Sequence, residues 1–185
     1  MSHDIPQRLF RVLNRFFMVP MFRLGLGPFM GNPLSGYIMV IRTVGRKSGK
    51  IRYAPVNYVI HKGDIYCLAG FGHTSDWYRN VSANPQIELI LPGGAISGRA
   101  EAVADREEKR VLVRQLLKNA GFAGFFEGFN PYTISDEELM RKVGDLPFLR
   151  ITPTGIGASA CDPGGLAWVW WVVLIVILGI WVILK

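Results

Sequence analysis

A short basic loop holds the residues of this sequence that could most directly do chemistry. Gly45–Arg52, with the sequence GRKSGKIR, carries four cationic side chains, two glycines and the hydroxyl of Ser48. Guanidinium and backbone N–H groups can converge on phosphate or carboxylate oxygens, and glycine allows close backbone approach. The residue order of a Walker loop is absent. The segment is therefore either an anion-binding loop or an ordinary solvated turn.

Other reactive side chains are few. The histidines are His3, His61 and His73, and no catalytic triad is evident. Among them His73 follows a glycine-rich stretch and is the candidate for a proton donor or an anion contact. The cysteines, Cys67 and Cys161, form no C-x-x-C pattern, so we expect reduced thiols and no metal site.

Positive charge is concentrated in the first third of the chain. Residues 1–52 hold nine Lys and Arg against one acid, Asp4, whereas the remaining residues hold twelve against thirteen acids. This asymmetry favours an anionic partner: a phosphorylated ligand, a membrane surface or nucleic acid. No nucleic-acid-binding module is recognisable, so we do not expect nucleic acid.

The apolar pattern predicts a mainly β domain with accessory helices, an α+β fold. Short apolar runs bounded by turn residues predict six strands and a small antiparallel barrel. Helices are expected at 76–81 and 105–120, with Ser75 or Asp76 as the N-cap of the first. The strands are expected at residues 37–43, 53–61, 65–69, 87–91, 95–103 and 146–152.

The N-terminal segment Ile5–Leu26 predicts a basic amphipathic helix that is ended or kinked at Pro20. Such a helix either lies on an anionic bilayer or packs on its own domain.

The last residues predict a membrane anchor. Leu166–Leu184 is nineteen residues without a charge, and tryptophans cluster at its start. This length and pattern predict a C-terminal transmembrane helix, with the basic domain in the cytoplasm. The expected divisions are 1–35 for the N-terminal helix and connection, 36–153 for the cofactor-binding domain, 154–165 for a linker and 166–184 for the transmembrane helix.

Three motifs together resemble a known family. They are GRKSG at 45–49 followed by Arg52 and Pro55, a glycine-rich strand end, and DWYRN at 76–80 followed by ANP at 83–85. In this order they resemble the deazaflavin (F420)-dependent nitroreductase family, over about residues 9–153. The resemblance implies a six-stranded antiparallel split β-barrel of the FMN-binding-like kind. It also implies coenzyme F420, which carries a deazaflavin ring and a polyanionic phospholactyl–polyglutamate tail.

The resemblance further implies roles for individual residues. The anionic tail would be held by Arg46, Lys47, Ser48, Gly49, Lys50 and Arg52. The ring would lie between Pro55, Val56 and Asn57 on one side and Ala69, Gly70, Phe71 and Gly72 on the other. Trp77 and Tyr78 would support the pocket, although Trp77 is equally suited to core packing. Tyr132, with Phe125, Phe126 and Phe129, would form an aromatic lid over the substrate.

This chain departs from the family in one respect: the further lysine through which family members bind F420, ahead of the tryptophan, has no counterpart here, and His73 and Arg79 are the nearest basic groups. The expected function is F420-dependent transfer of a hydride from reduced deazaflavin to a quinone or nitro-aromatic-like acceptor at the membrane. Tyr132 and His73 are the candidate catalytic residues. The alternatives are an FMN-dependent reductase and a non-enzymatic, membrane-anchored barrel that binds a cofactor or lipid. A homodimer is left open.

Overall fold

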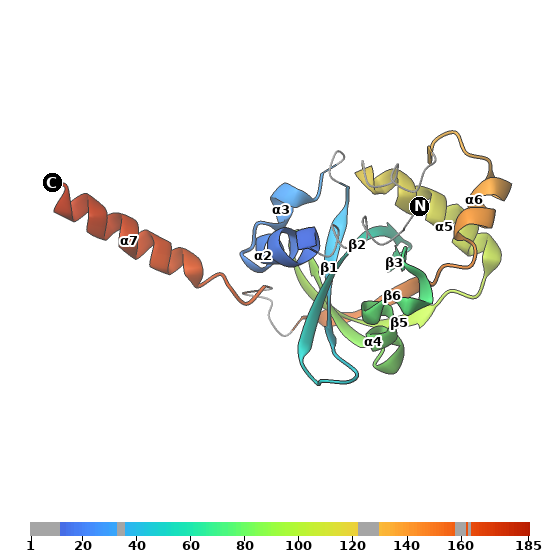
Figure 1. Cartoon of the computed structure of the whole chain (residues 1–185), viewed down its shortest axis with the longest axis horizontal. Coiled ribbons are helices and arrows are strands. Elements are labelled where there is room, and N and C mark those ends of the chain that lie inside the picture. Colours follow the sequence, from blue (N-terminus) through green and yellow to red (C-terminus); the bar gives the residue numbers. More distant parts are fainter. Residues whose placement is uncertain (1–11, 33–35, 122–129, 158–161, 163) are drawn as a thin grey trace.

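Within the residues that this computed structural model describes (12–32, 36–121, 130–157, 162 and 164–185), six antiparallel strands form a closed barrel (Figure 1). The strands pair in the order β1-β2-β3-β6-β5-β4, and β4 pairs back onto β1. The predicted barrel is therefore confirmed. The strands are β1 Ile38–Val44, β2 Ile51–His61, β3 Asp64–Leu68, β4 Gln86–Leu91, β5 Gly94–Ala102 and β6 Phe148–Ile156.

Most of the helices cover the ends and the outside of this barrel. They are the π-helical turn η1 Asn14–Met18, α2 Val19–Arg23, α3 Gly27–Met30, the 3₁₀ turn η2 Gly72–Thr74, α4 Asp76–Ala83, α5 Arg106–Asn119, α6 Asp136–Val143 and α7 Val169–Ile183. Helix α6 was not predicted, although Ser135 and Glu138 mark its start. The Ser135 hydroxyl accepts a hydrogen bond from the Glu138 backbone N–H, as an N-cap residue does.

The barrel core follows the two-residue period of its strands. Met39 and Ile41 of β1 point inward and meet Cys67, Leu89 and Ile151, all of which are buried. Burial raises the pKa of the Cys67 thiol to about 12, because the thiolate would lose its hydration there. Cys67 is therefore a packing residue of the core.

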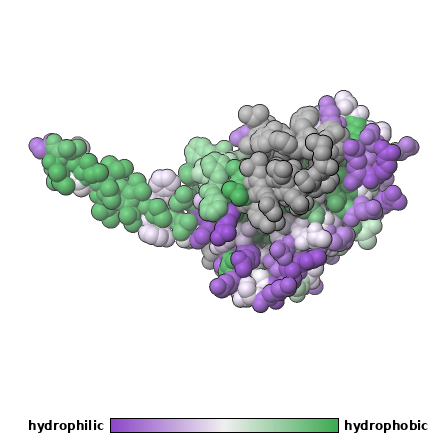
Figure 2. Space-filling model, viewed as in Figure 1, coloured by the Kyte–Doolittle hydropathy of each residue, from purple (hydrophilic) through white to green (hydrophobic). Residues whose placement is uncertain are grey.

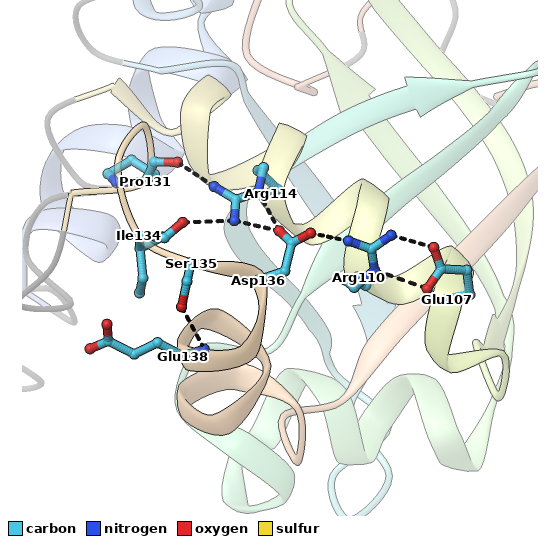
Figure 3. Close-up of polar contacts among 8 residues, drawn as sticks. All are labelled: Glu107, Arg110, Arg114, Pro131, Ile134, Ser135, Asp136 and Glu138. Carbon is cyan, nitrogen blue, oxygen red and sulfur yellow. Dashed lines mark hydrogen bonds and ion pairs between the residues drawn. The ribbon is translucent and has the colours of Figure 1, made fainter.

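Helices α5 and α6 form a second core on the outside of β2, β3 and β6, and a polar cluster fixes α6 to α5 (Figure 3). Arg114 donates to the Asp136 carboxylate (Nε to Oδ1, 2.9 Å) and to the backbone carbonyls of Pro131 and Ile134. Arg110 also pairs with Asp136. The hydrogen bond from Arg114 is the main reason that the pKa of Asp136 is lowered from its usual value.

The described part of the N-terminal helix, from residue 12 onward, packs on the barrel, and residues 5–11 of the predicted helix lie outside the described residues. Met18 and Phe22 are buried in a cluster with Val40 and Ile90. At Pro20 the chain changes from a π-helical to an α-helical turn, since proline has no N–H for the usual hydrogen bond. Four apolar residues of the predicted stripe are nevertheless exposed, namely Val12, Leu13, Phe16 and Phe17.

The predicted transmembrane helix at 166–184 is wrong. No helix within the described residues is long and apolar enough to cross a bilayer. Helix α7 has fifteen residues, which rise about 22 Å at 1.5 Å per residue against a hydrocarbon core of about 30 Å. The predictions that depended on this helix are corrected with it: single-pass membrane location, cytoplasmic placement of the domain, and the lipid bilayer as a partner.

Helix α7 is shorter than the apolar run because residues 166–168 and Leu184 do not form part of it. The Asp162 carboxylate accepts a hydrogen bond from the Ala167 backbone N–H, and Trp170 Nε1 donates to the Leu24 carbonyl oxygen (2.8 Å). Figures 1 and 2 show the rest of α7 as an apolar arm that projects from the barrel.

Replacing Phe22 by Ala should strongly destabilise the fold. Its side chain is only 1% exposed, and truncating a buried phenylalanine typically costs about 3–5 kcal/mol of unfolding free energy. Phe29 is 75% exposed, so Phe29→Ala should change the unfolding free energy by less than about 0.5 kcal/mol. Urea unfolding of both variants checks this; equal losses would contradict the packing of this helix on the barrel.

The contribution of Asp136 to stability should depend on pH. Because its pKa is lowered in the folded state, the contribution is fully present above the unfolded pKa of about 3.9 and is lost as the pH falls through the folded value. The difference in unfolding free energy between wild type and Asp136→Asn should therefore be largest near neutral pH and vanish in acid. Glu137→Gln, in the same helical turn, is the control. A difference that does not change between pH 7 and pH 3 would refute this linkage.

Candidate functional site

The basic loop between β1 and β2 is a tight hydrogen-bonded turn. The Gly45 N–H donates to the Lys50 carbonyl oxygen (2.8 Å), and the Ser48 and Gly49 N–H groups donate to the Gly45 carbonyl oxygen. Gly49 has φ +65°, which favours glycine. A Cβ at Gly45 would lie 3.0 Å from Ser48 Oγ. The two glycines therefore allow this turn and leave the cationic side chains on its outside.

Arg46 joins this loop to the start of α4. Its guanidinium donates to Asn80 Oδ1 (2.9 Å) and to Asp76 Oδ1 (3.0 Å), and its backbone N–H also donates to Asn80 Oδ1 (3.2 Å). Asn80 is buried. The loop and α4 thus lie at the same end of the barrel (Figure 1). Arg46, expected among the tail-binding residues, has hydrogen-bond partners within the protein itself.

A pocket of about 940 Å³ opens between this loop, β2, the start of α4 and the N-terminal helix. Its described walls bring together seven of the predicted cofactor-binding residues, which come from four segments of the chain: the β1–β2 loop, β2, the loop after β3, and α4. The seven residues are Arg46, Lys47, Ser48, Arg52, Pro55, Phe71 and Trp77.

The charges around the pocket are mostly uncompensated. Its walls carry the cations Arg15, Arg46, Lys47 and Arg52, and a single acid, Asp76, which pairs with Arg46. Within the described part of the chain, the other three cations form no ion pair with a carboxylate; Arg52 donates only a long hydrogen bond to Ser48 Oγ (3.5 Å). This end of the pocket therefore suits a polyanionic ligand.

The remaining walls are mainly apolar and aromatic. Pro55 and Tyr53 come from β2, whereas Phe71 and Trp77 come from the segment that follows β3. Phe71 is 50% exposed. Trp77 also packs against the barrel core, so it combines both of its expected roles. A flat ring can lie against such surfaces by stacking.

Other predicted cofactor-binding residues do not form the described wall. Val56 and Tyr78 pack against the barrel core, Ala69 is fully buried, and the Asn57 amide donates to the Tyr37 carbonyl oxygen. Gly49, Lys50 and Gly70 lie in the adjoining loops, and Gly72 begins the 3₁₀ turn η2. Their roles toward a cofactor stay predictions.

The two candidate catalytic residues also lie apart from this wall. The His73 ring meets the Tyr78 ring edge-on at 5.5 Å, and Tyr132 is 61% exposed with the Lys118 ammonium 5.5 Å from its ring centre. The other members of the expected lid, Phe125, Phe126 and Phe129, lie outside the described residues. The catalytic roles of His73 and Tyr132 stay predictions.

Several wall residues were not predicted from the sequence. Three of them, Asn14, Arg15 and Val19, lie in the N-terminal helix, far from the motifs in sequence. Ser75 occupies the N-cap position of α4, but its buried Oγ makes no hydrogen bond to any described residue. The others are Gly45, Ile51, Tyr53, Ala54, Thr74, Asp76 and Asn80. Of these wall residues, only those next to the GRKSG or DWYRN motif could have been found from the sequence.

These residues fit the cofactor expected from the sequence. Unpaired cations and a glycine-containing turn match a phosphate and carboxylate tail, and the apolar and aromatic walls match a deazaflavin ring. Within the described residues, no group of three or more His, Cys, Asp or Glu side chains could hold a metal ion. The donor set is that of an organic anion site.

Comparison with known proteins agrees with this chemistry. A sequence model of the F420H(2)-dependent quinone reductase family matches residues 18–128, more than half of the chain. A solved F420-H2 dependent reductase is 25% identical over 62% of this chain and 91% of its own, with a TM-score of 0.41. A conserved hypothetical protein from Mycobacterium tuberculosis is 16% identical over 65% of this chain and 74% of its own, with a TM-score of 0.47. General Stress Protein 26 from Bacillus anthracis is 13% identical over 72% of this chain and 89% of its own, with a TM-score of 0.42.

Because these TM-scores are below 0.5, the assignment rests on the family model. It confirms the family resemblance and the expected cofactor. The chain belongs to the F420H(2)-dependent quinone reductase family, and it is an oxidoreductase that uses coenzyme F420.

Proposed function

We propose that the pocket between the β1–β2 loop, β2 and α4 is the F420 site, and that the enzyme passes a hydride from the reduced cofactor to a quinone. One observation carries this proposal: unpaired cations at one end of a 940 Å³ pocket adjoin apolar and aromatic walls. That division matches the polyanionic tail and the flat ring of one cofactor. The family name supports the quinone as acceptor.

The basic turn would bind the tail. Lys47 and Arg52 supply the positive charge, and the hydroxyl of Ser48 lies between them, close to Arg52. Hydrogen bonds from charged donors to phosphate and carboxylate are roughly twice as strong as neutral ones. The short turn restricts the loop backbone, so its cations are held near the pocket before the cofactor arrives.

The other walls would orient the ring and exclude water. Bound, reduced F420 supplies the hydride, so the protein needs to position donor and acceptor rather than provide a nucleophile. Pro55, Phe71 and Trp77 offer apolar surface for this purpose. A quinone that accepts a hydride also takes up a proton, for which His73 and Tyr132 stay the predicted donors.

A nitro-aromatic-like compound is the second acceptor, because it too is flat and electron-poor.

The division at 36–153 for the cofactor-binding domain, the linker at 154–165 and the homodimer are further proposals. Strand β6 itself runs to Ile156, into the expected linker.

Removing charge from the basic turn should weaken cofactor binding without unfolding the protein. We expect Lys47→Gln and Arg52→Gln each to raise the Kd for F420 about tenfold, since each removes one charge-assisted contact to an anion. Tryptophan quenching measures the Kd, with FMN titrated in parallel. Arg106→Gln, which removes an exposed charge at the start of α5, is the control. Unchanged affinity in both loop variants would contradict the proposed tail site.

Arg46 should behave differently from its neighbour Lys47. Because Arg46 bonds to Asp76 and Asn80, Arg46→Gln should lower the melting temperature as well as the affinity, whereas Lys47→Gln should lower the affinity alone. Thermal unfolding in the absence of cofactor distinguishes the two variants. Equal melting temperatures would show that the Arg46 contacts do not support α4.

The acceptor is tested by oxidation of reduced F420, followed by its absorbance, with a water-soluble quinone and a nitro-aromatic compound at matched concentrations. We expect a higher kcat/KM for the quinone. A preference for the nitro-aromatic would replace the proposed acceptor and keep the cofactor site. No turnover of either, with F420 bound, would overturn the proposed reaction.

A further inference from the structure

The pocket has a wall that the family match does not include. Asn14 and Arg15 line it from the π-helical turn η1, whereas the family match begins at residue 18. The N-terminal helix therefore forms part of the pocket wall and also packs on the barrel.

The π-helical turn explains how Arg15 reaches the pocket. In a regular α-helix, Arg15 would lie on the same face as Met18 and Phe22, which are buried. Here the Val19 N–H donates to the Asn14 carbonyl oxygen, five residues back. The extra residue in this turn rotates the preceding residues by about 100° relative to those that follow. Arg15 is thereby moved from the buried face toward its edge.

Contacts farther along the helix keep this edge beside β2. The Arg23 guanidinium lies 5.1 Å from the centre of the Tyr53 ring, and Tyr53 is itself a wall residue of the pocket. Phe22 anchors the same helix in the core. The helix is thus held along the strand from which Arg52 and Pro55 project.

Among the described residues, the Arg15 side chain contacts an aromatic ring rather than a carboxylate. Its guanidinium lies 5.4 Å from the centre of the Phe16 ring, and it forms no ion pair with a carboxylate among the residues that the structure describes. It borders the same pocket as Lys47 and Arg52. Three cations, from η1, the β1–β2 loop and β2, therefore face one volume, and an anion between them would relieve their mutual repulsion.

We propose that Arg15 is a further cofactor-binding residue, whose guanidinium binds an anionic oxygen of the F420 tail. The ligand chemistry is a phosphate or a carboxylate, both of which a guanidinium recognises through paired N–H groups. This inference rests on the proposed function, because it needs the tail to occupy the same pocket. It makes the N-terminal helix a determinant of affinity for the tail.

The test measures binding to the full-length chain by tryptophan quenching. Arg15→Gln should raise the Kd for F420 about tenfold, as loss of one charge-assisted contact predicts. Arg15→Lys should recover part of the affinity, because it keeps the charge and loses the paired donors. Arg99→Gln, which removes an exposed charge from β5, should leave the Kd unchanged. The melting temperatures of all variants without cofactor should be equal.

Shortened ligands separate tail binding from a structural role. A deazaflavin alcohol without the phospholactyl–glutamate tail should bind wild type and Arg15→Gln equally; equal weakening of both ligands would overturn the proposal. A tail that ends at the phospholactyl group distinguishes the two anions. If it retains the tenfold effect, Arg15 binds the phosphate, and if it loses the effect, Arg15 binds a glutamate carboxylate.

The two proposals fail in different ways. If wild type binds F420 and Arg15→Gln binds it equally well, the role of Arg15 is refuted and the proposed function stands. If the wild-type chain does not bind F420, the proposed cofactor site is refuted, and the inference about Arg15 with it.

Discussion

The contacts of Arg46 with Asp76 and Asn80 are the constraint on which the pocket depends. These contacts join the β1–β2 loop to α4 across thirty residues of sequence, the separation of Arg46 and Asp76. Asn80 is buried and accepts two hydrogen bonds from Arg46, so the position of α4 and that of the loop are set together. One arginine is thus used within the protein, and Lys47 and Arg52 are left for an anion.

The sequence predicted the structure best where local patterns, such as β-branched runs bounded by turn residues, agree with the tertiary structure. The six strands were predicted because β-branched runs are separated by turn residues, and the GRKSG and DWYRN motifs located two walls of the pocket. Arg46 shows the limit of this reasoning, since a basic residue in an anion-binding motif looks the same whether it faces a ligand or a neighbouring helix. Helix α6 was missed, although Ser135 and Glu138 carry the pattern of a helix start.

The transmembrane error has a physical cause: a hydropathy pattern does not fix where a helix begins. Leu166–Leu184 is uniformly apolar, but Asp162 holds Ala167 in a turn, so α7 starts only at Val169. Such a pattern does not fix helix phase either, because the π-helical turn before Pro20 rotates the residues that precede it. In that helix Met18 and Phe22 are buried, whereas Phe16 and Phe17 are exposed. Arg15 could not be assigned to the pocket without this rotation.

The closed barrel has a consequence for how the chain can meet other proteins. Every strand in the described residues has a hydrogen-bonded neighbour on both sides, including β1 with β4. Closure does not pair every residue on both sides: within the described residues, β3 pairs with Tyr58–His61 of β2, whereas residues 51–57 of β2 pair with β1 alone. Backbone pairing with another polypeptide is thereby restricted to such part-paired segments, which limits edge-to-edge aggregation.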